Sequence, residues 1–232
     1  PKRLKKIRRA VDLLLTIFPF ETGFLARHQV PARYVGHPLA HDMPLQPDRE
    51  AARSALGLDA GRPVLALLPG SRGGEVSRLS RPFLETASTL QREMPDLQLV
   101  VPLVNERTRS IFRNQLQKTA PGLGPVIALG RTRAALAAAD VVLVASGTAT
   151  LEGLLSKRPM VVGYKVNGAT YFLVQFLRLV KVKHVAMANL LADERLAPEL
   201  IQDQCEPGLL VPPLLRFFRD PGLRERIAAR YT

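Results

Sequence analysis

Two short stretches of small and polar residues carry groups that can bind a phosphate. The first, residues 145–152, follows a buried-looking apolar run, a pattern typical of a strand, a tight turn and a helix that begins near Thr148. The first N–H groups of such a helix and the positive end of its dipole point at one spot. Gly147 leaves room for a ligand beside the backbone, and Ser146 adds a hydroxyl to that of Thr148. Glu152, one turn further, can accept from a sugar hydroxyl, although an ordinary capped strand-to-helix turn has the same pattern.

The second stretch, residues 69–75, is rich in glycine and contains Gly70, Ser71, Arg72 and Gly73. Its glycines permit a sharp turn near an anion, and the guanidinium of Arg72 has a fork of donors suited to a diphosphate. A surface turn with a solvated arginine fits the composition equally well. The spacing matches neither GxxxxGK[ST] nor GxGxxG, which disfavours a P-loop ATPase and a dinucleotide oxidoreductase.

Further polar residues follow the later strands and helices. Tyr164 and Lys165 end an apolar run, where the lysine can meet a phosphate or simply lie on the surface. Asn189 follows the next expected strand and can bind an amide or hydroxyl, or cap a helix. Glu199 and Gln202 are expected together on a helix after it.

Apolar runs alternate with helical patterns along most of the chain. The expected strands are residues 13–18, 33–35, 64–68, 97–102, 126–129, 141–145, 160–164 and 184–187. The expected helices are residues 21–27, 48–56, 80–94, 106–118, 132–139, 148–157 and 170–179, with others from Pro198, Gly208 and Pro221. This alternation predicts an α/β fold: a Rossmann-like parallel sheet with helices on both faces and right-handed crossovers. Ligands of such sheets bind at the carboxyl ends of the strands, so the two phosphate-type loops are expected on neighbouring strands.

Composition limits the function classes. The 232 residues carry a net charge of +13, and six positive charges fall within the first nine residues. Such a bias suits nucleic acid, a nucleotide or an anionic membrane, but no aromatic platform beside the basic start supports nucleic acid. The single Cys205 excludes an internal disulfide and fits a reducing cytoplasm. No metal-ligand spacing is present, so neither a metal nor another cofactor is expected.

Several motifs taken together resemble the lipid-A-disaccharide synthases. They are VGHPL at 35–39, LLPGSRGGEV at 67–76, VVPLVN at 100–105, ASGTATLE at 145–152, PMVVGYK at 159–165 and NLL at 189–191. The resemblance extends over nearly the whole chain. It implies an inverting glycosyltransferase with a GT-B-like fold of two Rossmann-like domains, of which this chain would be the donor-binding half and the tail of the other.

The implied reaction transfers 2,3-diacylglucosamine from its UDP donor to 2,3-diacylglucosamine 1-phosphate, giving lipid A disaccharide 1-phosphate and UDP. The resemblance implies that Glu152 binds the ribose and that Asn189, Glu199 and Gln202 face the cleft between the domains, with His37 as a further cleft residue. The general base is expected in the missing N-terminal half, so no catalytic residue is assigned. The phosphate loops also fit a UDP-GlcNAc 2-epimerase, a peptidoglycan GlcNAc transferase or an inactive UDP-sugar-binding half.

Four regions follow from these patterns. Residues 1–42 are expected to end the N-terminal, acceptor-side domain, 43–62 to form a linker and short helix, 63–205 the UDP-sugar-binding domain, and 206–232 the C-terminal helices. An apolar helix at 171–179, followed by basic residues, would contact an anionic membrane, or else form a core or homodimer helix. The expected location is cytoplasmic, peripherally on the inner face of the bacterial inner membrane.

Overall fold

The computed structural model describes residues 2–166 and 184–232. The chain divides into two compact units, Pro1–Pro44 (unit 1) and Leu45–Thr232 (unit 2).

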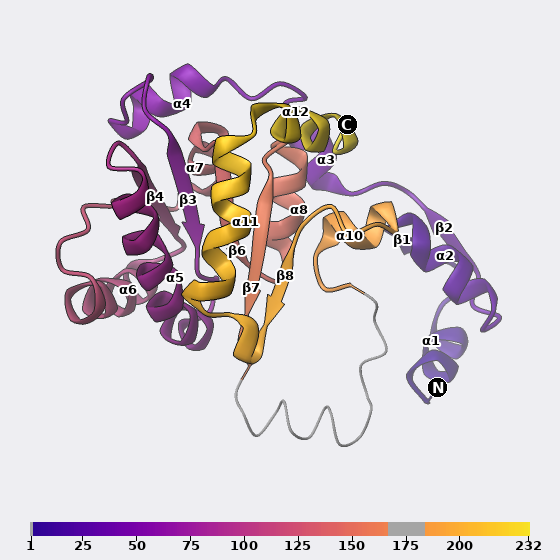
Figure 1. Cartoon of the computed structure of the whole chain (residues 1–232). Helices are drawn as coiled ribbons and strands as arrows, with labels where there is room; N and C mark the ends of the chain where they lie inside the picture. Colours follow the sequence, from indigo (N-terminus) through magenta and orange to yellow (C-terminus); the bar gives the residue numbers. More distant parts are fainter. Residues whose placement is uncertain (1, 167–183) are drawn as a thin grey trace. The chain divides into compact units, whose positions relative to one another are not determined.

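Unit 1 contains two short parallel strands and three helices (Figure 1). They are α1 (Lys2–Ala10), β1 (Leu14–Thr16), α2 (Pro19–Ala26), β2 (Ala32–Tyr34) and α3 (Pro38–Asp42). Both expected strands are present: β1 is shorter than the expected residues 13–18, and β2 has the expected length but begins one residue earlier. No element was expected at residues 38–42; Pro38 begins a helix because proline is tolerated at the first helical position and the His37 ring caps it, accepting from Leu39 N at 3.1 Å.

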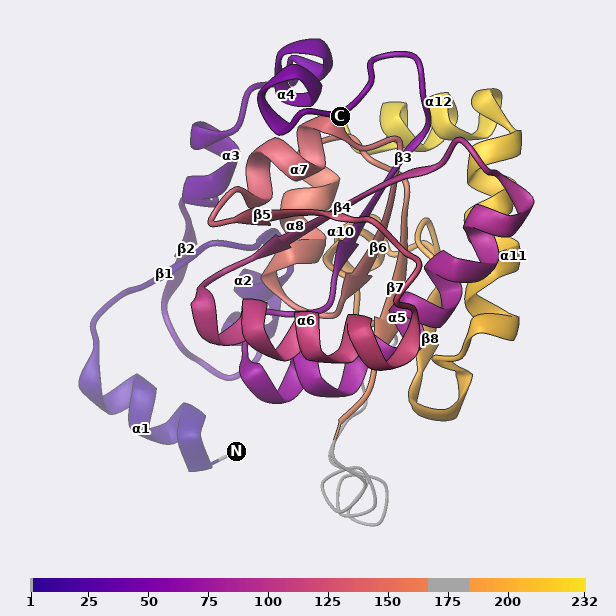
Figure 2. The same cartoon turned by 90° about the vertical axis from the view of Figure 1, so that its left-hand side faces the viewer.

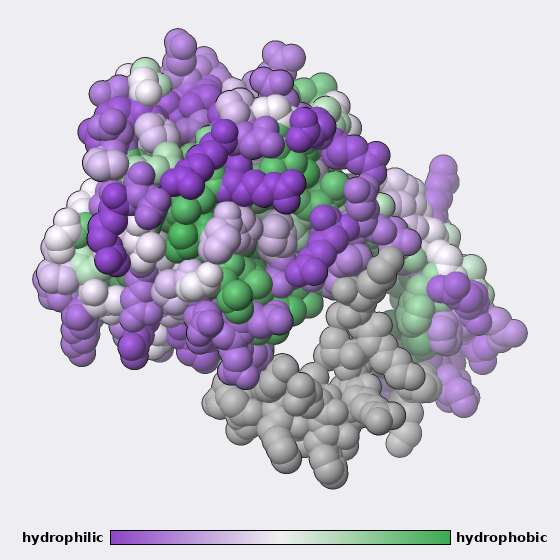
Figure 3. Space-filling view, viewed as in Figure 1, coloured by the Kyte–Doolittle hydropathy of each residue, from purple (hydrophilic) through white to green (hydrophobic). Residues whose placement is uncertain are grey.

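Large apolar side chains remain exposed on unit 1, and Figure 3 shows hydrophobic area on this unit beside hydrophilic side chains. They are Leu13, Leu15, Ile17, Phe20, Phe24, Tyr34 and Val35. Parallel strands normally have both faces covered. Unit 1 by itself therefore lacks the cover that a two-stranded parallel sheet requires.

In the part of unit 2 that the structure describes, one six-stranded sheet has the order β5-β4-β3-β6-β7-β8, and every pairing in it is parallel. Its strands are β3 (Val64–Leu68), β4 (Gln98–Leu103), β5 (Val126–Leu129), β6 (Val141–Ala145), β7 (Met160–Tyr164) and β8 (Glu199–Ile201). Every residue of β3 and β6 is buried, as their continuous apolar sequences predict.

Helices cover both faces of this sheet (Figures 1 and 2). They are α4 (Arg49–Leu56), α5 (Gly73–Glu93), α6 (Glu106–Thr119), α7 (Thr132–Ala138), α8 (Thr148–Leu155), α10 (Met187–Ala192), α11 (Pro207–Arg219) and α12 (Pro221–Arg230). The helices α5, α6 and α11 pack on one face, and α7 and α8 pack on the other. The expected α/β fold with helices on both faces is confirmed.

Two expected elements near the end of the sheet are wrong. The expected strand at 184–187 is absent, and Met187 instead begins α10, because the run Met187–Ala192 consists mainly of good helix formers. The helix expected from Pro198 is replaced by β8 and a 3₁₀ turn, η1 (Gln202–Gln204). Glu199 therefore lies on an edge strand opposite Val162 of β7 and not on a helix. The expected helix at 170–179 lies outside the described residues.

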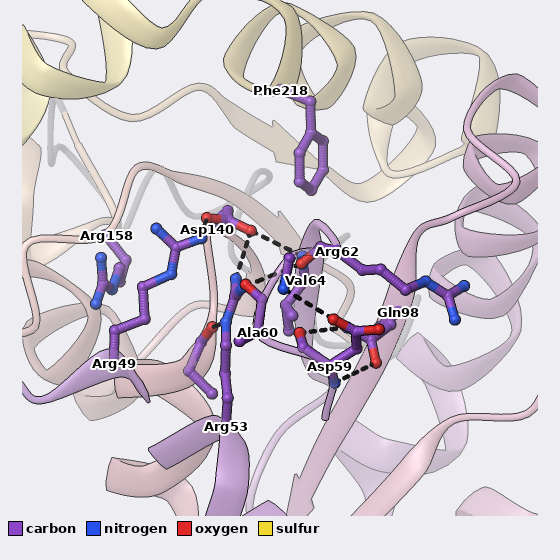
Figure 4. A network of polar contacts seen from close by, with 12 residues as sticks. Arg49, Arg53, Asp59, Ala60, Arg62, Val64, Gln98, Asp140, Arg158 and Phe218 are labelled. Atoms are coloured by element: carbon purple, nitrogen blue, oxygen red, sulfur yellow. Dashed lines mark hydrogen bonds and ion pairs between the residues drawn. The ribbon is translucent and has the colours of Figure 1, made fainter. Parts of the chain in front are cut away.

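A buried ion pair fastens α4 to the sheet (Figure 4). Arg53 is 1% exposed, and its guanidinium donates to Asp140 Oδ2 at 2.8 Å and to Ala138 O at 2.9 Å. The same carboxylate oxygen accepts from Val64 N at 2.8 Å, and Oδ1 pairs with the half-exposed Arg49. Asp140 thus joins the beginnings of the adjacent strands β3 and β6 to α4.

Candidate functional site

The strand order places one crevice at the carboxyl edge of the sheet. From β3 the chain moves through β4 to β5 in one direction, and from β6 through β7 to β8 in the other. The loops after β3 and β6, which are adjacent strands, therefore diverge at a topological switch point, where open α/β sheets bind their ligands. The expectation that both phosphate-type loops follow neighbouring strands is confirmed.

A cavity of about 300 Å³ lies at this point. Seven of the predicted site residues line it: Gly70, Ser71, Arg72, Ser146, Gly147, Thr148 and Glu152. Leu68, Glu75, Pro102, Val104, Thr132, Ala145 and Ala149 complete the lining. The volume is at the lower end of the range for small-molecule sites.

The turn between β6 and α8 presents backbone N–H groups to the cavity. Gly147 precedes the helix at φ 137° and ψ −158°, a region that only glycine readily adopts. Thr148 is the first helical residue, and the first N–H groups of a helix have no acceptor within it. The Ser146 hydroxyl donates to Val185 O at 3.1 Å, so it braces the turn in this structure. The N–H groups and the exposed Thr148 hydroxyl are the anion-binding groups of this turn.

The glycine-rich loop is shaped by Glu75. Its Oε2 accepts from Ser71 N at 3.1 Å and from Arg72 N at 3.2 Å, while Oε1 lies 3.3 Å from a guanidinium nitrogen of Arg72. Gly70 has φ 120°, and a Cβ there would lie 2.6 Å from the Cβ of Glu75. This carboxylate satisfies the loop amides, so the Arg72 side chain, 84% exposed, is the group of this loop that can reach an anion.

Glu152 projects into the cavity from α8 and is half-buried. Burial raises the pKa of its carboxyl, and the positive charge of Arg133 opposes that rise. A carboxylate at this position can accept hydrogen bonds from the hydroxyls of a sugar.

The raised pKa of Glu152 has a consequence for stability. Between the ordinary and the raised pKa the folded protein holds more protons than the unfolded chain, so the free energy of unfolding falls as pH rises through that interval. We expect Glu152→Gln to abolish this fall, so that the free energy of unfolding of the variant increases relative to that of the parent as pH rises. Urea unfolding across a pH series measures the difference, with the exposed Glu225→Gln as the matched control. A parent–variant difference that is constant with pH would contradict the assignment.

Asn189 lies outside the cavity, and its side-chain amide forms hydrogen bonds with other residues of the chain. Its side chain is 0% exposed. Nδ2 donates to Ala197 O at 2.7 Å and to Glu199 Oε1 at 2.9 Å, and Oδ1 accepts from Ala197 N at 2.8 Å. These bonds hold α10 against the segment before β8, which is a structural role. Asn189 does not line the cavity.

The remaining predicted residues are dispersed in the described part of the chain. Gly73 and Tyr164 do not line the cavity, and Lys165 lines a separate hollow with Arg78 and Arg81 of α5. Lys165 O accepts from Arg78 Nε at 3.2 Å. His37 belongs to unit 1, so its position in a cleft stays a prediction.

The sequence analysis missed Glu75 and Thr132 as lining residues. Glu75 occupies the third position of α5, where its carboxylate reaches back to the N-cap N–H, but the N-cap residue is Arg72 and not the Ser or Thr of the capping-box pattern, so that pattern did not mark it. Thr132 begins α7 after β5, at the same edge of the sheet. No sequence signal distinguishes Thr132 from other helix starts.

Two kinds of feature are absent from the described residues. Within residues 2–166 and 184–232, no group of three or more His, Cys, Asp or Glu side chains is placed to hold a metal ion. In the same residues, no helix combines the length and the apolar character needed to cross a membrane.

Comparison with known proteins gives a family match. Residues 1–216 match the family model described as lipid-A-disaccharide synthetase. The chain is 48% identical over 231 residues to a lipid-A-disaccharide synthase of Xanthomonas euvesicatoria and 47% identical over 214 residues to that of Hahella chejuensis. The match covers 99% and 92% of this chain and 53% and 54% of those relatives. The chain therefore spans about half the length of the curated relatives it matches.

Solved structures share the fold at low sequence identity. The C-terminal domain of a group 1 family glycosyl transferase from Francisella tularensis superposes with a TM-score of 0.56 and 17% identity, covering 81% of this chain and 91% of that domain. A UDP-GlcNAc 2-epimerase from Neisseria meningitidis, solved with UDP-GlcNAc bound, gives a TM-score of 0.57 and 12% identity, covering 91% of this chain and 55% of the epimerase. At these identities the similarity shows the fold alone.

Proposed function

The chain belongs to the lipid-A-disaccharide synthetase family, and from that premise we propose that unit 2 carries the donor site of an inverting glycosyltransferase. The donor is UDP-2,3-diacylglucosamine, the acceptor is 2,3-diacylglucosamine 1-phosphate, and the products are lipid A disaccharide 1-phosphate and UDP. Residues 63–205 form the donor-binding part. Unit 1, with its uncovered apolar side chains, supplies the end of the acceptor-side domain.

The observation that carries the proposal is the meeting of Arg72 and the Gly147 turn in one cavity at the switch point. In the transfer, an acceptor hydroxyl oxygen forms a bond to the anomeric carbon while the bond from that carbon to the diphosphate oxygen breaks. Negative charge grows on the leaving UDP. The Arg72 guanidinium and the N–H groups at Thr148 stabilise that charge, and Glu152 accepts from the ribose.

The proton of the acceptor hydroxyl needs a general base. We place this base in the half of the relatives that this chain does not match. In this proposal unit 2 binds and orients the donor and stabilises its leaving group, and it contributes no proton acceptor to the reaction.

Calorimetry with UDP tests the donor site. Arg72→Ala and Glu152→Ala should each weaken binding roughly ten- to hundredfold, because each removes hydrogen bonds to or from a charged group worth about 1.5–3 kcal/mol. Arg81→Ala is the matched control, since Arg81 is a similarly exposed arginine of α5, pairs with Glu85 and does not line the cavity. Parental affinity in both variants, with the fold unchanged by circular dichroism, would refute the site.

The transferase reaction itself is tested by UDP release with both acylated sugars. The chain alone should be inactive, and it should become active when combined with the N-terminal half of a relative.

We also propose peripheral attachment to an anionic membrane on the cytoplasmic face, supported by the exposed Lys5, Lys6, Arg8 and Arg9 of α1. Activity should therefore be higher with substrates in anionic than in neutral vesicles.

Unacylated UDP-GlcNAc, supplied in place of the acylated donor, separates the alternatives. A 2-epimerase would interconvert UDP-GlcNAc and its 2-epimer, and a peptidoglycan enzyme would accept unacylated UDP-GlcNAc. A chain that binds UDP but gains no activity with the N-terminal half would be an inactive donor-binding half.

A further inference from the structure

The side chains of Glu199 and Gln202 accept hydrogen bonds from the backbone on both sides of residues 167–183. Glu199, the first residue of β8, accepts at Oε1 from Val185 N at 3.0 Å and Ala186 N at 2.7 Å. Gln202, three residues later, accepts at its own Oε1 from Val166 N at 2.7 Å. We call these five residues the neck.

The Glu199 carboxylate is fixed by more than backbone groups. Its Oε1 also accepts from Asn189 Nδ2 at 2.9 Å, and Asn189 is in turn held by both backbone groups of Ala197. Three donors from residues 185–189 therefore meet one oxygen. Such a convergence fixes the path of the backbone that enters α10.

The other side of that backbone touches the donor-site turn. Val185 O accepts from the Ser146 hydroxyl at 3.1 Å. Met187 N donates to Thr150 Oγ1 at 3.1 Å, and the Thr150 hydroxyl donates to Gly147 O at 2.8 Å. Residues 185–187 thus connect the Glu199 carboxylate to the turn that presents its N–H groups to the cavity.

The backbone at Gln202 supports a specific role for the neck. Gln202 has φ 56°, a left-handed conformation that is uncommon for residues other than glycine. It lies directly after β8, where the chain bends into η1, and its side chain reaches back to Val166. Conformations of this kind persist where surrounding contacts enforce them.

We propose that Glu199 is a positioning residue of the donor site, which acts through the neck and does not contact the nucleotide. Glu199 sets the Ser146–Gly147 turn through Val185, and Gln202 fixes the other end of the neck at Val166. This inference rests on the proposed function, in which that turn receives the diphosphate. It replaces the expectation that both side chains face a substrate cleft.

Glu199→Gln and Glu199→Ala distinguish the two roles. All three bonds end on Oε1, so the amide oxygen of glutamine can accept the same three hydrogen bonds, whereas alanine loses them. We expect UDP affinity about tenfold weaker in Glu199→Ala and within about twofold of the parent in Glu199→Gln. Equal losses in both variants would show that the carboxylate charge itself acts on the ligand, and parental affinity in both would show that the neck does not set the turn; either result overturns the proposal.

Hydrogen exchange of single amides tests the neck without any ligand. In Glu199→Ala the Val185 and Ala186 amides should exchange at least about tenfold faster than in Glu199→Gln. In Gln202→Gly, which relieves the left-handed backbone but removes the acceptor, the Val166 amide should exchange faster while the Val185 amide stays protected. Glu194→Ala, which removes a surface glutamate paired with Arg230, is the matched control and should change neither.

The two assays separate the two proposals. A parent protein that binds no UDP refutes the donor site, and the exchange rates then still decide whether Glu199 and Gln202 hold the neck. Unchanged exchange at Val185 and Ala186 in Glu199→Ala overturns the neck even if UDP binds.

Discussion

Asp140→Ala is expected to lower the free energy of unfolding by about 3–5 kcal/mol, because it leaves the guanidinium of Arg53 buried without its counter-charge. The substitution also removes the acceptor of Val64 N, a backbone donor at the start of a fully buried strand. Burial already lowers the pKa of Arg53, and the Asp140 carboxylate opposes that shift. Urea unfolding measures the loss.

Arg49→Ala is the matched control for that prediction. Arg49 pairs with the same carboxylate, but its side chain is 44% exposed, and exposed ion pairs contribute about 0–1 kcal/mol. Asp140→Asn keeps an acceptor oxygen and should fall between the two. If Asp140→Ala is as stable as Arg49→Ala, the Arg53–Asp140 pair does not hold α4 to the sheet.

Elements with strong local patterns could be predicted from the sequence. The strands β5 and β7 begin and end at the predicted residues, and β6 does as well, because each is a continuous apolar run between turn residues. The short edge strand β8 could not be predicted, since three residues show no periodicity and its pairing with β7 is a tertiary interaction. The same limit applies to residues 184–187, which were predicted as a strand and of which only Met187 belongs to a regular element, α10.

The candidate site was predictable where backbone geometry determines the chemistry. Gly147 and Gly70 both have positive φ and line the cavity, as expected of glycines in ligand-binding turns. Side-chain partners were less predictable. An asparagine at position 189 can bind either a sugar or a backbone amide, and the sequence does not distinguish the two roles. Only the fold brings Ala197 and Glu199 to its side chain.

Gly147→Ala is expected to weaken UDP binding at least tenfold. With φ 137° and ψ −158°, Gly147 lies in a region where an alanine costs about 1–3 kcal/mol, so the turn will rearrange. A rearranged turn redirects the N–H group of Thr148 and disturbs the Ser146 bond to Val185 O, and both changes weaken a site made of fixed backbone donors. An added Cβ meets no protein atom within 4 Å, so the effect arises from the backbone and from the space that a ligand occupies.

Gly57→Ala separates the loss of binding from the loss of stability. Gly57 ends α4 at φ 67° with equally open space around it, and it does not line the cavity. Alanine there should cost about 1–2 kcal/mol of stability and leave UDP affinity unchanged. Calorimetry and urea unfolding on both variants make the comparison. If the two glycine variants lose affinity equally, or if Gly147→Ala loses none, the turn after β6 does not bind the diphosphate, and Arg72 alone cannot support the donor site.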